Sequence, residues 1–188
     1  MVEKEEYHHV FDVLVGARVA FEQKNILALK ELSNKTIHTA SVIQDSDSIT
    51  IAVLIYALSK IIERSQYQSL PGWEKFQRTC DEKLEEAVDS LKRHDQKNFL
   101  KNLQEIQESL SKVSGSLKLY VQDVFRKARI NKASKMYEHG ISLGKTAKLL
   151  GVTLWELSQY TGQRETDTHY FDTKDVKIRA KEALRMFS

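Results

Sequence analysis

Turn-forming residues are scarce in this chain of 188 residues, which contains one proline and seven glycines. β-Sandwiches and barrels need many short turns, and proline and glycine supply much of the backbone geometry of those turns. The scarcity therefore favours a few long helices. Apolar residues also recur at steps of three and four along most of the chain, as in helices that bury one face. We predict an all-α fold.

Residues 1–125 contain several such helices and are expected to form a bundle. The patterning places helices at residues 3–23, at 25–43 with Asn25 as its cap, around 49–62, and from Pro71 to about His94. Residues 49–62 are apolar on most faces, so we expect this helix at the bundle centre. The run is too short to cross a bilayer, which takes about 20 residues. The sequence predicts no membrane contact.

A seam with a period of 3.5 residues follows this part of the chain. It consists of Phe99, Leu103, Ile106, Leu110, Val113, Leu117, Tyr120 and Val124. Such a seam is typical of one continuous coiled-coil helix. Its partner is either the preceding antiparallel helix or the same helix of a second copy, and the second alternative predicts a homodimer.

Several functional classes lack their usual residues. Cys80 is the single cysteine, which excludes an internal disulfide framework and a multi-cysteine zinc site. His38, Asp45 and Asp47 have no recognised ligand spacing, and the acids fit helix caps better. No phosphate-binding glycine loop or nucleophile elbow is present. We expect no cofactor and no metal. Residues 2–6, VEKEE, are mostly charged and show no signal-peptide pattern, so we expect a cytoplasmic protein.

Charge divides the chain unequally. From Arg126 to the end there are 13 Lys and Arg against 7 Asp and Glu, a net charge of +6. The first 125 residues carry 16 against 19, a net charge of −3. A basic end on a mildly acidic body indicates an anionic partner, although a solvated basic surface is the alternative. We treat residues 126–188 as a second domain, joined to the bundle by a long connecting helix.

This second domain carries the most specific pattern. Gly140 is predicted to end a helix, and Ser142 to cap a short one at residues 143–150. Gly151 then supplies a sharp turn before a second short helix from Thr153 to about Thr161. Small Ala147 stands where the two helices approach, and Leu150, Val152, Leu157 and Tyr160 occupy the inward positions. This is the layout of a helix-turn-helix.

The same residues carry a family resemblance. The segment 142–157, SLGKTAKLLGVTLWEL, resembles the core of the predicted helix-turn-helix antitoxins of prokaryotic toxin–antitoxin operons. Residues 170–176, with a helix expected after them, are similar to the family's tail. The resemblance covers about the last 50 to 60 residues. It implies a small DNA-binding regulator that acts as a dimer and contacts a partner protein.

Helix-turn-helix geometry directs the early residues of the second helix into the major groove. That face comprises Thr153, Leu154, Trp155, Ser158 and Gln159. Gln159 suits an adenine, and Thr153 or Ser158 a base edge or a phosphate. Lys145 and Lys148, with Arg129 and Lys132 upstream, would neutralise phosphates of double-stranded DNA, alongside Arg126, Lys127 and Lys135. Leu154 and Trp155 either contact thymine methyls or pack against the terminal helix or a partner protein.

An enzymatic alternative rests on residues 33–38, SNKTIH. They resemble the Arg-Asn-x-x-x-His element of helical ribonuclease-like domains of the HEPN type, which implies an RNA-processing role for Asn34 and His38. Ser33 stands where that element has arginine, which removes the charge that would stabilise a developing phosphate negative charge. A hydrogen-bonded polar pair is the simpler interpretation. The sequence as a whole favours a non-enzymatic DNA-binding regulator, with a protein-interaction module as the alternative.

Overall fold

A computed structural model describes residues 4–43, 46–112 and 115–168. All regular structure in these residues is helical, which confirms the all-α prediction. The elements are α1 (Lys4–Glu22), α2 (Ile26–Ile43), α3 (Ser46–Glu63), a 3-10 turn η1 (Ser65–Tyr67), α4 (Trp73–Lys92), α5 (Gln96–Lys112), α6 (Gly115–Glu138), α7 (Leu143–Leu150) and α8 (Leu154–Thr168).

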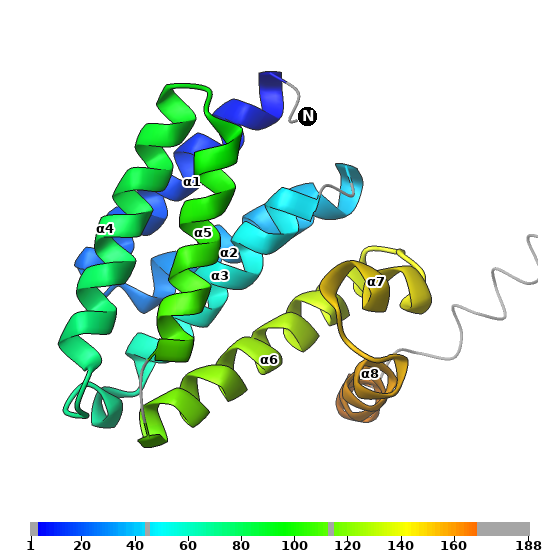
Figure 1. Cartoon of the computed structure of the whole chain (residues 1–188). Helices are drawn as coiled ribbons and strands as arrows, with labels where there is room; N and C mark the ends of the chain where they lie inside the picture. Colours follow the sequence, from blue (N-terminus) through cyan, green and yellow to red (C-terminus); the bar gives the residue numbers. More distant parts are fainter. Residues whose placement is uncertain (1–3, 44–45, 113–114, 169–188) are drawn as a thin grey trace, which may run out of the picture.

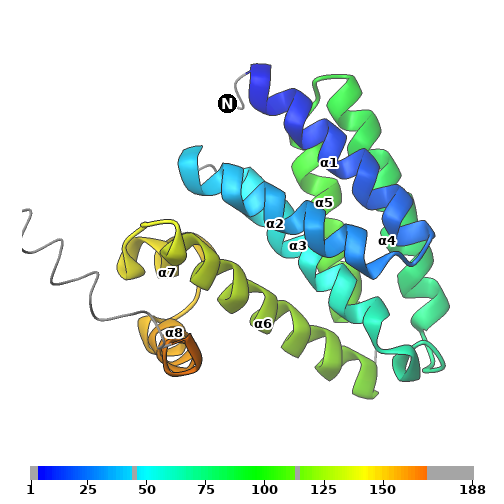
Figure 2. The same ribbon diagram turned by 180° about the vertical axis from the view of Figure 1, so that it is seen from behind.

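Two helix pairs and one long helix organise the molecule (Figure 1). α2 pairs with α3, α4 pairs with α5, and α1 packs on α4 and α2. Figure 2, the view from behind, shows α1 in front of the α4–α5 pair. α6 runs along α3 and contacts α2 and α5, then carries α7 and α8 at its C-terminal end. The helix-turn-helix elements thus stand at one side of the bundle.

α3 occupies the centre, as its apolar sequence predicts. Residues 51–55 are all buried, as are Ala57, Leu58 and Ile61. α2 covers one side of α3, α6 covers another, and α1 and α5 make smaller contacts with it. A helix that is apolar on most faces needs neighbours on most faces, and this arrangement supplies them. Within the described residues, no helix is long and apolar enough to cross a membrane.

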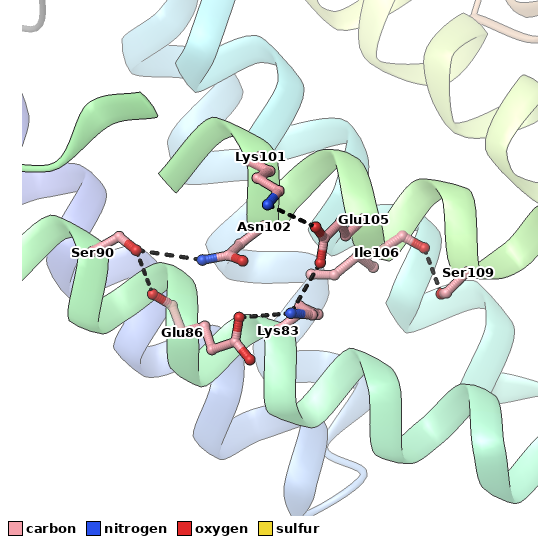
Figure 3. A network of polar contacts seen from close by, with 8 residues as sticks. All are labelled: Lys83, Glu86, Ser90, Lys101, Asn102, Glu105, Ile106 and Ser109. Atoms are coloured by element: carbon pink, nitrogen blue, oxygen red, sulfur yellow. Dashed lines mark hydrogen bonds and ion pairs between the residues drawn. The ribbon is translucent and has the colours of Figure 1, made fainter. Parts of the chain in front are cut away.

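The α4–α5 pair combines an apolar seam with a polar edge. All seven stripe residues of α4 are buried: Trp73, Phe76, Cys80, Leu84, Ala87, Val88 and Leu91. At the edge (Figure 3), the Lys83 ammonium bonds the carboxylates of Glu86 at 2.6 Å and Glu105 at 2.9 Å. The Asn102 amide donates to the Ser90 hydroxyl at 3.3 Å. The Lys83–Glu105 and Asn102–Ser90 contacts join α4 to α5, whereas the Lys83–Glu86 pair lies within α4.

The prediction of one continuous seam helix is wrong. α5 ends at Lys112, and α6 begins at Gly115, whose φ of +66° lies in the left-handed region that glycine tolerates. Phe99, Leu103 and Ile106 pack in the α4–α5 pair, whereas Leu117, Tyr120 and Val124 are buried on α6, which runs along α3. The period continues across the break because both helices bury one face in the same core. The described residues of the seam are buried against other helices of the same chain. The seam therefore no longer supports a homodimer, which stays a prediction.

Candidate nucleic-acid interface

Residues 126–138 of α6, together with α7 and α8, form a three-helix unit that we call the tripod. Gly140, at φ +87°, turns the chain after α6, and the Ile141 amide donates to the Met136 carbonyl across this turn at 3.3 Å. Ser142 caps α7, accepting from the Lys145 amide at 3.4 Å. Gly151 ends α7 in the left-handed conformation at φ +61°. These features confirm the local geometry expected from the sequence.

The start of α8 is fixed by a reciprocal pair that the sequence analysis missed. The Glu156 amide donates to the Thr153 hydroxyl oxygen at 3.1 Å, and the Thr153 amide donates to the Glu156 carboxylate at 3.0 Å. This capping box appears in the sequence as threonine followed by glutamate three residues later. Arg126 of α6 also bonds the carboxylate, at 2.7 Å. Hydrogen bonds from Thr153, followed by the contact with Arg126, lower the pKa of Glu156 to about 2.

The inner side of the tripod is apolar, as predicted. Ala147, Leu150 and Leu157 are buried where α7 and α8 meet α6. Val152 and Tyr160 are half-buried. The Asn131 amide of α6 donates to the Tyr160 hydroxyl at 3.1 Å, which adds a polar tie between α6 and α8. The tripod therefore has its own small core, continuous with that of the bundle through α6.

The outer side of α8 faces solvent and holds the five residues predicted for base contact, Thr153, Leu154, Trp155, Ser158 and Gln159, which we call the reading face. Leu154 is 54% exposed and Trp155 is 69% exposed. Two hydroxyls on this face have local partners: that of Thr153 serves the capping box, and that of Ser158 donates to the Trp155 carbonyl at 3.1 Å. Gln159 has no partner among the described residues, so its amide is the group on this face best placed to meet a base.

Three of the predicted phosphate contacts are on the surface: Arg129 on α6 and Lys145 and Lys148 on α7 are exposed. Ion pairs engage three further cations, Arg126 with Glu156, Lys127 with Asp123 and Lys135 with Glu138. The prediction for Lys132 is wrong, because its side chain is completely buried and cannot reach a phosphate.

Lys132 lies instead between α6 and the α2–α3 pair. Its ammonium donates to the Asn34 side-chain oxygen at 2.8 Å and stands 4.4 Å from the centre of the Tyr56 ring. Burial, followed by repulsion from Lys135, lowers the pKa of this amine to about 7. A sequence signal for this burial existed: Val124, Ala128, Lys132 and Met136 follow at steps of four on one face of α6, and the other three are apolar.

Asn34 contacts α6, and His38 contacts His139, the first residue after α6. Asn34 accepts from Lys132, and His38 Nδ1 lies 3.4 Å from His139 Nε2 with the rings edge to face. Ser33, in the place of the ribonuclease-type arginine, is buried and donates to the Ala52 carbonyl at 2.6 Å. The side chain at that position therefore faces the core. The geometry gives Asn34 and His38 a role in attaching α2 to α6.

The remaining candidates from the sequence are the metal ligands, residues 170–176 and Cys80. Among the described residues no group of three or more His, Cys, Asp and Glu is arranged to hold a metal ion. Asp45, considered above with His38 and Asp47 as a metal ligand, lies outside the described residues. So do residues 170–176, which resemble the tail of the antitoxin family. Cys80 is completely buried, and burial raises the pKa of its thiol. No protein-family model, curated protein or solved structure matches this chain.

Proposed function

We propose that the tripod binds double-stranded DNA and that the protein acts as a DNA-binding regulator. The observation that carries this proposal is the exposed outer side of α7 and α8, where the reading face and the side chains of Lys145 and Lys148 are open to solvent. A helix-turn-helix needs this surface free to enter a groove. The resemblance of residues 142–157 to antitoxins of toxin–antitoxin operons supports the same assignment.

The charge of the tripod suits a polyanion. Residues 126–162 contain seven Lys and Arg against two Asp and Glu. Both acids, Glu138 and Glu156, are bonded to a cation, so neither presents a bare carboxylate to an approaching phosphate. Lys132 is buried, whereas Arg129, Lys145 and Lys148 are exposed and can reach a phosphate. Their attraction to phosphates supplies most of the affinity, because such contacts release counterions from the duplex.

Sequence specificity is expected to be weak. Gln159 can pair with an adenine edge, but no arginine stands on the reading face to recognise guanine. Thr153 is committed to the capping box and so contributes little to base recognition. The proposed activity is duplex binding that tolerates many sequences and prefers sites with adenine opposite Gln159.

A salt titration tests the proposal. Three phosphate contacts predict a slope of about −2.7 in a plot of log affinity against log salt, which corresponds to roughly 40-fold weaker binding at 200 mM than at 50 mM salt. Fluorescence anisotropy of a labelled duplex measures this slope. No binding at 50 mM salt, or binding indifferent to salt, contradicts the proposal.

Charge reversal locates the surface. The double variant Lys145→Glu, Lys148→Glu is expected to abolish binding at 50 mM salt, because it replaces two attractive contacts with repulsive ones. Lys75→Glu is the matched control, since Lys75 is an exposed lysine on α4 away from the tripod. Equal loss of binding in the control and the double variant would show that the tripod is not the binding surface.

A second candidate function follows from the exposure of Leu154 and Trp155. Two adjacent large apolar side chains exposed by more than half are unusual at a DNA surface and typical of a protein-binding surface. Here the tripod would hold a partner protein, as the antitoxin resemblance also implies. Leu154→Ser with Trp155→Ser should then abolish capture of the partner while the Lys145 and Lys148 reversals leave it intact. If instead the Lys145 and Lys148 reversals abolish duplex binding and the Leu154 and Trp155 changes leave it intact, the first candidate is favoured.

A further inference from the structure

A cleft of about 540 Å³ lies where the tripod meets the bundle. α3, α6 and α8 form its walls, so it joins the core helix of the bundle to the helix that carries the reading face. Its volume lies in the range of about 300 to 1,000 Å³ that is usual for small-molecule sites. A cleft between two units of a regulator is a place where a ligand can affect both.

Four aromatic side chains line the cleft: Tyr56, Tyr120, Trp155 and Tyr160. Fixed partners hold two of them. The Tyr120 hydroxyl donates to the Lys60 carbonyl at 2.8 Å, and its ring stacks on Tyr67 with 3.6 Å between ring centres. The Tyr160 hydroxyl accepts from Asn131. Tyr120 is buried, so the rings open to a flat ligand are those of Tyr56, Trp155 and Tyr160. A ring that is already oriented, as Tyr160 is, loses little freedom when a ligand stacks on it.

The charged side chains of the cleft favour an anion. Four cations line it, Lys60, Arg64, Arg126 and Lys127, against three acids, Glu63, Asp123 and Glu156. Each acid is already bonded to a lysine or arginine. Arg64 lies 5.6 Å from the Tyr120 ring centre and forms no ion pair with a described residue. Its guanidinium, beside an aromatic wall, can pair with a phosphate or carboxylate in a two-bonded geometry.

We propose that this cleft binds a small planar aromatic anion of about the size of a nucleoside monophosphate. The ring stacks on the aromatic wall and the anionic group pairs with Arg64. Trp155 and Gln159 line the cleft and also belong to the reading face. A bound ligand therefore competes with DNA for these two side chains and weakens duplex binding. This competition rests on the proposed DNA-binding function, whereas ligand binding itself does not.

The two tryptophans provide a direct test on the full chain. Adenosine 5′-monophosphate and 2-naphthoate serve as probes with a phosphate and a carboxylate, respectively. In a ¹H–¹⁵N spectrum the Trp155 indole signal should shift saturably with either probe. The Trp73 signal should stay in place, because Trp73 is 4% exposed and its indole donates to Gln77 at 3.1 Å. Adenosine has the ring without the anionic group, and inorganic phosphate has the anionic group without the ring. Each should bind at least about ten-fold more weakly than adenosine 5′-monophosphate.

Variants identify the anion site. Arg64→Gln is expected to weaken the affinity for the tighter-binding probe about ten-fold. Arg78 is an exposed arginine on α4, and Arg78→Gln should leave that affinity unchanged. No saturable Trp155 shift with either probe overturns the proposal. Unchanged affinity in Arg64→Gln, or phosphate alone binding as tightly as the nucleotide, overturns it as well.

A duplex titration then tests the competition. A saturating probe should reduce duplex affinity in the wild type several-fold, with a much smaller effect in Arg64→Gln. Ligand binding without any effect on the duplex refutes the competition and leaves the site intact. If the protein binds no duplex at all, the Trp155 shift still decides whether the cleft takes the ligand.

Discussion

Replacing Lys132 with methionine should stabilise the protein at and below neutral pH. The side chain is completely buried, and its ammonium faces the Asn34 oxygen and the Tyr56 ring, with no ion pair to a carboxylate of the described residues. Methionine keeps the length of the chain and removes the charge. Asn34 is exposed, so its freed oxygen can bond water. Replacing a buried charge with an apolar side chain of similar volume is often stabilising.

The pKa of Lys132 gives the magnitude. It falls from the ordinary value of 10.5 to about 7 in the folded protein, and a shift of this size corresponds to about 5 kcal/mol. Methionine cannot form the hydrogen bond to Asn34, which offsets about 1 to 2 kcal/mol of this. We therefore expect Lys132→Met to raise the free energy of unfolding by about 3 kcal/mol at pH 6.

The pH dependence follows from proton binding. Between pH 7 and 10.5 the unfolded chain keeps the Lys132 proton and the folded protein has released it, so wild-type stability rises with pH across this window. Below pH 7 both states are protonated and the penalty is constant. In Lys132→Met this contribution is absent, so its free energy of unfolding does not rise with pH for this reason. Urea unfolding followed by circular dichroism from pH 6 to 10 measures both effects, with Lys75→Met as an exposed-lysine control. A variant less stable than wild type at pH 6, with the same pH slope, would refute the reasoning.

Further predictions concern the tripod and its contact with the bundle. Gly151→Ala should lower the free energy of unfolding by roughly 1 to 2 kcal/mol, because φ is +61° there. Gly144→Ala, inside α7 with open space at its Cβ position, should raise it by about 0.5 to 1 kcal/mol, and thermal denaturation distinguishes the two. Glu156 carries a lowered pKa of about 2, so its stabilising charge is present above its ordinary pKa of 4.5 and lost as pH falls towards 2. Amide exchange at the start of α8 should increase across that window, and an unchanged profile in Glu156→Gln would contradict this cause. Tyr120→Phe removes the bond to the Lys60 carbonyl and should cost about 1 kcal/mol in urea unfolding, and equal stability would show that the bond contributes nothing.

The fold was largely predictable because its helices follow simple periodicities. The stripe of α4, the fully apolar centre of α3 and the glycine turn at Gly151 each have a local cause that the sequence displays. The break before α6 was missed, because the alternating steps of four and three continue from Ile106 through Leu117, and in the sequence Gly115 is the sign of a change of direction. Local patterns report burial but do not report which helix provides the burial.

The candidate site was predictable only in part. Exposure of the reading face follows from helix geometry once Ala147 and Leu157 point inward. The burial of Lys132 went against its residue type, and the meeting of His38 with His139 joins residues that are 101 positions apart. The cleft between α3 and α8 likewise depends on tertiary packing. Such contacts are set by how α6 lies on the bundle, which no local spacing encodes.

α6 has a consequence for how the protein can be divided. Its 24 residues complete the covering of α3 at one end and form the first leg of the tripod at the other. A truncation at Arg126 would cut α6 near its middle, uncover part of α3, and leave α7 and α8 without the helix on which they pack. The bundle and the tripod therefore cannot be separated by a cut within α6. A fragment intended to isolate either of them should include the whole of residues 115–138.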